Sequence, residues 1–250
     1  YPAPNVFTAV GAEAAVNNYR RIGTSEVGAD QFDLRIDRYF SPGHRVFGRY
    51  SYLRDDSRPT TPLPDGSGNL SSGIIGDTLT RGDSLAAEHT WNLTAASVNQ
   101  LRLGFTRRAF RRSSLATGQP VERLTGIPNV PLTSFADVLP AFDIVGLQQL
   151  GPPASGNARF TTSVTQLIDN LSWARGGHSW KTGADIRWQR LDALQPPNPT
   201  GNFQFTSIFT GGLTPEGTAV PATGSSLASF LLGQVSRFRQ LFLGSSDGRD

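Results

Sequence analysis

The sequence has no cysteine and no methionine, and Lys181 is its single lysine. Without cysteine there can be neither a disulfide framework nor a thiolate metal site. No run of about 18 apolar residues is present, which excludes a transmembrane helix. The chain begins at Tyr1, without the basic and apolar regions of a signal peptide. We therefore expect an internal fragment of a longer protein.

Charge and motifs argue against a nucleic-acid-binding protein and against an enzyme. The net charge is only +3 and the arginines are spread along the chain, whereas a nucleic-acid module gathers its charge on one face or helix. There is no Walker loop, GxGxxG or HExxH motif. The histidines, His44, His89 and His178, are far apart in sequence, so they predict no metal site. We expect no enzyme, no cofactor and no nucleic-acid partner.

Glycine, proline and aromatic residues are plentiful. The chain has 27 Gly, 17 Pro and 10% aromatic residues, a composition typical of many short strands with irregular connections. Its mean hydropathy of -0.28 is compatible with insertion into a membrane by strands, because only every second residue of such a strand needs to be apolar. The composition therefore favours an all-β fold.

Three segments share one plan, in which two alternating strands flank a tight turn. They are Gln31–Arg54 with a turn at Ser41–His44, Leu85–Thr106 with a turn at Thr94–Ser97, and Leu167–Trp188 with a turn at Arg175–His178. In each strand, apolar and polar residues alternate with period two. Gly176 and Gly177 supply the positive φ that a tight hairpin requires.

The connections between these hairpins are long and rich in turn residues. They cover roughly residues 55–84, 113–162 and 192 onward, and the last contains a predicted short helix at Ser226–Gly233 between strands at Phe203–Phe209 and Ser236–Leu243. Such loops are unusual in a compact soluble domain. In an outer-membrane barrel, short turns face the periplasm and long loops face outward. We expect an open, curved, antiparallel up-and-down meander of about eight strands, part of a transmembrane β-barrel.

Alternation also predicts which strand face meets lipid. Arg or Lys against lipid near the midplane costs about 2 to 4 kcal/mol, so the polar faces are expected to line the lumen. The ligand-binding candidates on these faces are Arg35, Arg49, Arg102, Lys181, Asp185 and Arg187. His89 and Asp169 occupy strand positions whose side chains are expected to face lipid. Either they lie near the membrane interface, or the predicted register of their strands is wrong.

Aromatic side chains flank the predicted turns, as in the girdle of an outer-membrane barrel. They are Tyr39, Phe40, Phe47, Trp173 and Trp180. The same rings are also compatible with the core of a soluble β protein.

Two sets of charged residues have an open interpretation. The motif TRRAFRR, with Arg107, Arg108, Arg111 and Arg112, is expected at the outward end of its strand, where arginine can bind lipopolysaccharide phosphate or simply be solvated. The acids predicted in loops are expected to be hydrated, although they could also bind a cation or substrate. They are Asp55, Asp56, Asp65, Asp77 and Asp83.

Several segments carry a family resemblance: DQFDLRIDRYFSPGHRVFGRYSYLRDD, SVNQLRLGFTRR, QLIDNLSWARGGHSWKTGADIRWQR and SLASFLLG. They resemble the barrel of Oar-like TonB-dependent outer-membrane proteins. The resemblance implies a receptor or transporter in the outer membrane of a Gram-negative bacterium, energised by the TonB system, with an unidentified ligand. Residues 1–250 would be a single barrel segment, with the signal peptide, TonB box and plug lying upstream.

Two other classes compete with this interpretation. A soluble β-sandwich or an adhesin-like binding module would also contain alternating strands. A β-rich glycosidase fragment would need two convergent carboxylates, and no such pair is evident in the sequence.

Overall fold

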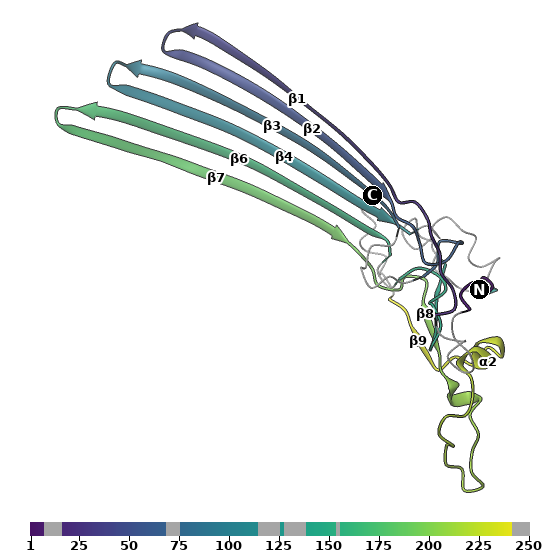
Figure 1. Ribbon diagram of the computed structural model, residues 1–250. Helices are drawn as coiled ribbons and strands as arrows, with labels where there is room; N and C mark the ends of the chain where they lie inside the picture. Colours follow the sequence, from purple (N-terminus) through teal and green to yellow (C-terminus); the bar gives the residue numbers. More distant parts are fainter. Residues whose placement is uncertain (8–16, 69–75, 115–125, 128–138, 154–155, 242–250) are drawn as a thin grey trace.

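Six long antiparallel strands form one sheet in the computed structural model (Figure 1), which describes residues 1–7, 17–68, 76–114, 126–127, 139–153 and 156–241. The order is β1-β2-β3-β4-β6-β7, so the strands lie in the sheet in their order along the chain, and β5, between β4 and β6 in sequence, belongs to another sheet. The strands are β1 (Glu26–Ser41), β2 (His44–Arg58), β3 (Asp77–Thr94), β4 (Ser97–Ser113), β6 (Ala158–Arg175) and β7 (His178–Leu194). This sheet confirms the predicted open meander.

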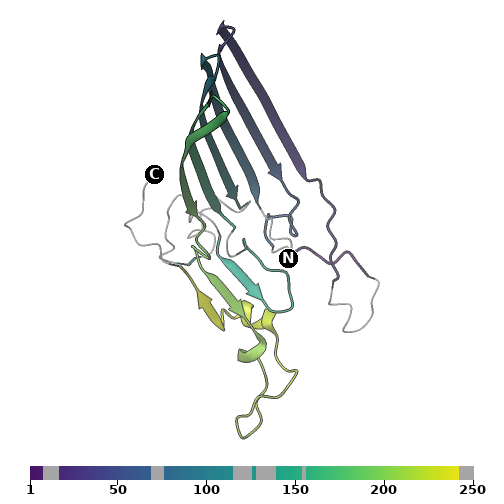
Figure 2. The same ribbon diagram turned by 90° about the vertical axis from the view of Figure 1, so that its left-hand side faces the viewer.

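The tight turns lie together at one end of the sheet, and the long connections lie at the other (Figures 1 and 2). Each turn joins two consecutive strands, β1 to β2, β3 to β4 and β6 to β7. Gly176, in the third turn, has a φ of 61°, a conformation that glycine adopts without steric cost. The predicted division into a short-turn end and a long-loop end is confirmed.

The strands are longer than their sequence patterns indicate. They contain 15 to 18 residues, whereas about 9 to 11 suffice to cross a bilayer. Asp55 and Asp56 lie in β2, and Asp77 and Asp83 lie in β3, so assigning these acids to loops was wrong. Backbone pairing continues into polar sequence, since Asp55 is opposite Ala29, although the apolar alternation has ended there.

A second, three-stranded sheet lies beyond the long-connection end. It consists of β5 (Ala141–Ile144), β8 (Asn202–Phe205) and β9 (Arg237–Arg239), with β5 and β8 parallel. Within the described residues the meander therefore has six strands, and the expected number of about eight was wrong. Local patterns miss this sheet because Ala141 pairs with Asn202, far along the chain.

The predicted helix is present as α2 (Ser226–Leu231), and it lies beside the small sheet (Figure 1). Ser225 caps it by accepting a hydrogen bond from the Ala228 N–H at 3.3 Å. The predicted strand at Phe203–Phe209 is divided between β8 and a 3-10 turn, η2 (Ser207–Phe209). Only β9 forms within the predicted Ser236–Leu243 strand, of which residues 242 and 243 lie outside the described part.

The small sheet, the long connections and the strand ends that adjoin them form what we call the outer region. The buried apolar side chains of the described residues lie there and not in the middle of the large sheet. They are Leu63, Ala141, Ile144, Ala158 and Phe205. Aromatic ring pairs stabilise the region, including Phe203 with Phe238 at 4.7 Å and Phe205 with Phe230 at 5.1 Å between centroids.

Among the described residues, no helix has the length and hydropathy needed to span a bilayer.

Gly151 allows a close backbone approach in the outer region. Its φ is 77°, and a Cβ there would overlap the Pro140 carbonyl oxygen. Gly146 also has a positive φ, of 88°, but a Cβ there meets nothing within 4 Å. Gly151→Ala therefore combines backbone strain with a clash, whereas Gly146→Ala has only the strain, about 1 to 2 kcal/mol.

We expect limited proteolysis of the full-length protein to cleave the outer region faster in Gly151→Ala than in Gly146→Ala. Equal cleavage rates for the two variants would contradict the close approach of residues 140 and 151.

Candidate functional site

The strand register brings all six predicted ligand-binding candidates onto one face of the large sheet. Arg35 is opposite Arg49, and the row continues through Ala86, Gly104 and Gln166 to Arg187. Arg102, Lys181 and Asp185 have the same parity in their strands. We call this the polar face and its opposite the apolar face.

Short ion pairs order the polar face. Arg49 Nη2 lies 2.8 Å from Asp33 Oδ1, which also accepts a hydrogen bond from Ser51. Arg35 Nε lies 2.7 Å from Asp37. Since the arginine side chains remain about half exposed, at 52% for Arg49 and 50% for Arg35, each pair contributes little to stability. The pairs therefore orient charge more than they stabilise the sheet.

The same pattern continues on the neighbouring strands. Arg102 Nε lies 2.7 Å from Glu88, and Gln166 donates to Asp185 at 2.8 Å. Within the described part of the chain, Lys181 and Arg187 form no salt bridge. These two cations are the candidates whose charge is least compensated by neighbours.

A shallow depression of about 150 Å³ lies at the centre of the polar face. It forms where small residues of adjacent strands, Ala86 and Gly104, are opposite one another. The ion pair between Glu88 and Arg102 lines one part of it, and Gln166 lines another. Sequence reasoning missed the depression because it depends on the juxtaposition of β3 and β4, although small residues at polar-face parity were a visible signal.

The opposite face carries a continuous band of exposed apolar side chains. They are Phe32, Leu34, Ile36, Phe40, Leu85, Trp91, Leu103, Phe105, Trp180, Ile186 and Trp188. Along β7, Trp180 and Trp188 bound the band and are separated by about 26 Å at ~3.3 Å per residue. A strand tilt of roughly 40° shortens this to about 20 Å, close to the apolar band of an outer-membrane barrel.

This single layer excludes the alternative of a soluble β-sandwich. In a sandwich, a second sheet would cover the apolar face, yet Ile36 is 64% and Trp188 58% exposed. The predicted alternation of apolar and polar rows is confirmed along Ser179–Gln189, where Ile186 pairs with Leu167 and Arg187 with Gln166.

The predicted aromatic girdle is correct in part. Phe40, Trp173 and Trp180 lie on the apolar face near the tight turns, and Trp173 stacks on Trp180 at 6.2 Å. Assigning Tyr39 and Phe47 to the girdle was wrong, because their register places them on the polar face. There the Arg35 guanidinium lies 4.4 Å above the Phe47 ring. Strand parity, and not nearness to a turn, decides which face a ring occupies.

His89 and Asp169 lie on the apolar face as their parity indicated, close to its turn end. His89 is two residues from Trp91 in β3, and Asp169 is opposite Leu101. Both have polar partners, since the Nε2 atoms of His89 and His44 are 2.7 Å apart and Asn99 donates to Asp169 at 2.8 Å. The pairing of His44 with His89 was not predicted, because the two histidines are 45 positions apart.

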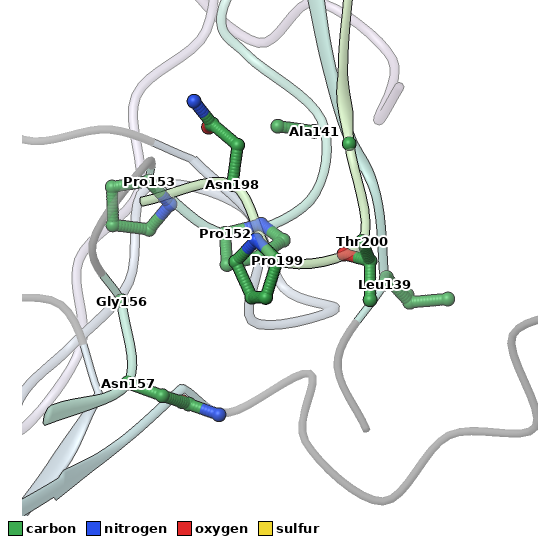
Figure 3. A pocket seen from close by; sticks show the side chains of 10 residues that line it. Leu139, Ala141, Pro152, Pro153, Gly156, Asn157, Asn198, Pro199 and Thr200 are labelled. Atoms are coloured by element: carbon green, nitrogen blue, oxygen red, sulfur yellow. The ribbon is translucent and has the colours of Figure 1, made fainter. Parts of the chain in front are cut away.

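No metal centre is evident in the described residues, and one hollow away from the polar face is too small for an organic ligand. No group of three or more His, Cys, Asp or Glu there is placed to hold a metal. A hollow in the outer region, lined by Pro152, Asn157 and Asn198 among others (Figure 3), has a volume of about 10 Å³. That is room for about one water molecule.

One family model, described as an outer membrane beta barrel domain, matches residues 1–248. No curated protein and no solved structure matches the chain. The match covers nearly the whole chain, and the open sheet with one apolar and one polar face agrees with it. The chain therefore belongs to the outer membrane beta barrel domain family, and its six-stranded sheet is part of a barrel wall.

Proposed function

We propose that this barrel segment belongs to a TonB-dependent receptor or transporter in the outer membrane of a Gram-negative bacterium. In this proposal the full-length protein takes up a ligand with energy from the TonB system and performs no catalysis. The observation that carries the proposal is the charged polar face, on which Arg35, Arg49 and Arg187 lie in one row. If lipid covers the apolar face, this row faces the barrel interior.

The interior charges favour contact with a polar ligand or a plug over a packed apolar interior. Arg49 and Arg102 are about half exposed even within their ion pairs. Lys181 and Arg187 add cations for which the described residues offer no ion pair. Partly desolvated arginine suits planar anionic groups, because its guanidinium donates two parallel hydrogen bonds.

The open edges of the sheet support a barrel larger than six strands. Among the strands that the structure describes, β1 and β7 each pair on one side only. Unpaired backbone groups in lipid cost several kcal/mol each, so further strands are required to close the wall. Transporters of this class have about 22 strands and a plugged lumen, whereas a porin leaves its channel open.

The plug and the TonB partner can be tested together on the full-length protein. Liposomes containing it should not swell in an isotonic solution of a small sugar, because a plug closes the lumen. The same protein should be retained on an immobilised periplasmic domain of TonB, and a porin provides the matched control for both assays.

Rapid swelling would identify an open pore, and failure to bind TonB in a folded sample would remove the energised mechanism. Either result would contradict the proposal, whereas a closed lumen together with TonB binding supports it.

A further inference from the structure

The motif TRRAFRR lies in the last part of β4, at the end away from the tight turn, as predicted. The register, however, divides its arginines between the two faces. Arg107 and Arg111 have the parity of Phe105 and lie on the apolar face, whereas Arg108 and Arg112 lie on the polar face. Only the first pair can therefore face lipid.

Neighbouring strands add two arginines on the same side. Arg81 of β3 is opposite Ala109, between Arg107 and Arg111, and Arg159 of β6 is directly opposite Arg111. All four are exposed. We call Arg81, Arg107, Arg111 and Arg159 the outer arginine cluster.

Several acids on this face have ion-pair or hydrogen-bond partners outside the cluster. Asp56, Asp77 and Asp192 pair with Arg54, Arg58 and Arg190, none of which belongs to the cluster. Asp83 is opposite Arg107 in register, but its Oδ1 accepts a hydrogen bond from Tyr50 at 2.6 Å. Within the described residues, no cluster arginine forms a salt bridge.

Such an arrangement is unfavourable without an anion. Arg111 and Arg159 are like charges directly opposite one another on adjacent strands, which destabilises a sheet. An anion between them would remove the repulsion, and phosphate is well matched because guanidinium groups bind its oxygens in pairs.

The height of the cluster identifies the source of the phosphate. Arg107 follows Phe105, the last large apolar side chain of β4 on this face, by only about 7 Å along the strand. The cluster lies at the long-loop end, which in outer-membrane barrels faces outward. A lipid whose acyl chains cover the apolar band would place its headgroup at this level.

We propose that the outer arginine cluster binds the phosphorylated headgroup of lipid A in the outer leaflet. This inference is independent of TonB-dependent transport, because it concerns the lipid-facing surface alone. Arg81 and Arg159 belong to the site although they lie outside the sequence motif, and Arg108 and Arg112 do not belong to it.

The test uses purified full-length protein in detergent micelles, titrated with lipid A and with lipid A from which the phosphates have been removed. Arg107→Gln with Arg111→Gln should weaken lipid A binding by about tenfold or more, since the double variant removes two cations that donate charged hydrogen bonds to phosphate. Arg159→Gln tests the cluster independently from β6, and should also weaken binding. Arg108→Gln is the matched control, an exposed neighbour on the opposite face, and should leave affinity unchanged.

Thermal melting first establishes that each variant is folded. The proposal is overturned if folded Arg107→Gln/Arg111→Gln and Arg159→Gln both retain wild-type affinity, or if Arg108→Gln loses as much affinity as the double variant. It is also overturned if dephosphorylated lipid A binds equally well, or if millimolar inorganic phosphate displaces lipid A completely, which would indicate a site for free anions.

Discussion

The ladder of backbone hydrogen bonds between adjacent strands determines which environment each side chain meets. Because side chains alternate with period two, a slip of one residue would exchange the two faces of a strand. In β7 such a slip would turn Lys181, Asp185 and Arg187 towards lipid. The cost of transferring these charges into lipid therefore stabilises the observed register. The register in turn produces the row of Arg35, Arg49 and Arg187, the depression on the polar face and the outer arginine cluster on the opposite face.

The large sheet is stabilised differently from a soluble domain. Its two faces are exposed, and most buried apolar residues, such as Ile144 and Phe205, lie in the outer region. The apolar face can be covered by lipid because neighbouring strands satisfy its backbone groups. Beyond the apolar band both faces are polar, which explains how the same strands support a lipid-facing wall and charged surfaces above it.

Sequence alone was sufficient for the hairpins and for the faces, because apolar and polar residues alternate clearly where one face meets lipid. Sequence alone was insufficient beyond the apolar band, where apolar and polar residues no longer alternate. The polar extension of β2 at Asp55–Arg58 resembles a loop, and the parallel pairing of β5 with β8 joins distant segments. Likewise, the sequence placed all six ligand-binding candidates on one face. The depression at Ala86 and Gly104 and the contribution of Arg159 to the outer arginine cluster could not be predicted, because they depend on which strands are neighbours.

Cysteine labelling of β7 tests the two-faced wall most directly, and the absence of cysteine from these 250 residues gives a clean background in this segment. In full-length protein in native membranes, Arg187→Cys should react with a membrane-impermeant maleimide, whereas Ile186→Cys should be protected by lipid. The paired positions on β6 give an independent repeat, with Gln166→Cys reactive and Leu167→Cys protected. The reverse pattern in both strands would show that the polar face meets lipid, and it would contradict the account.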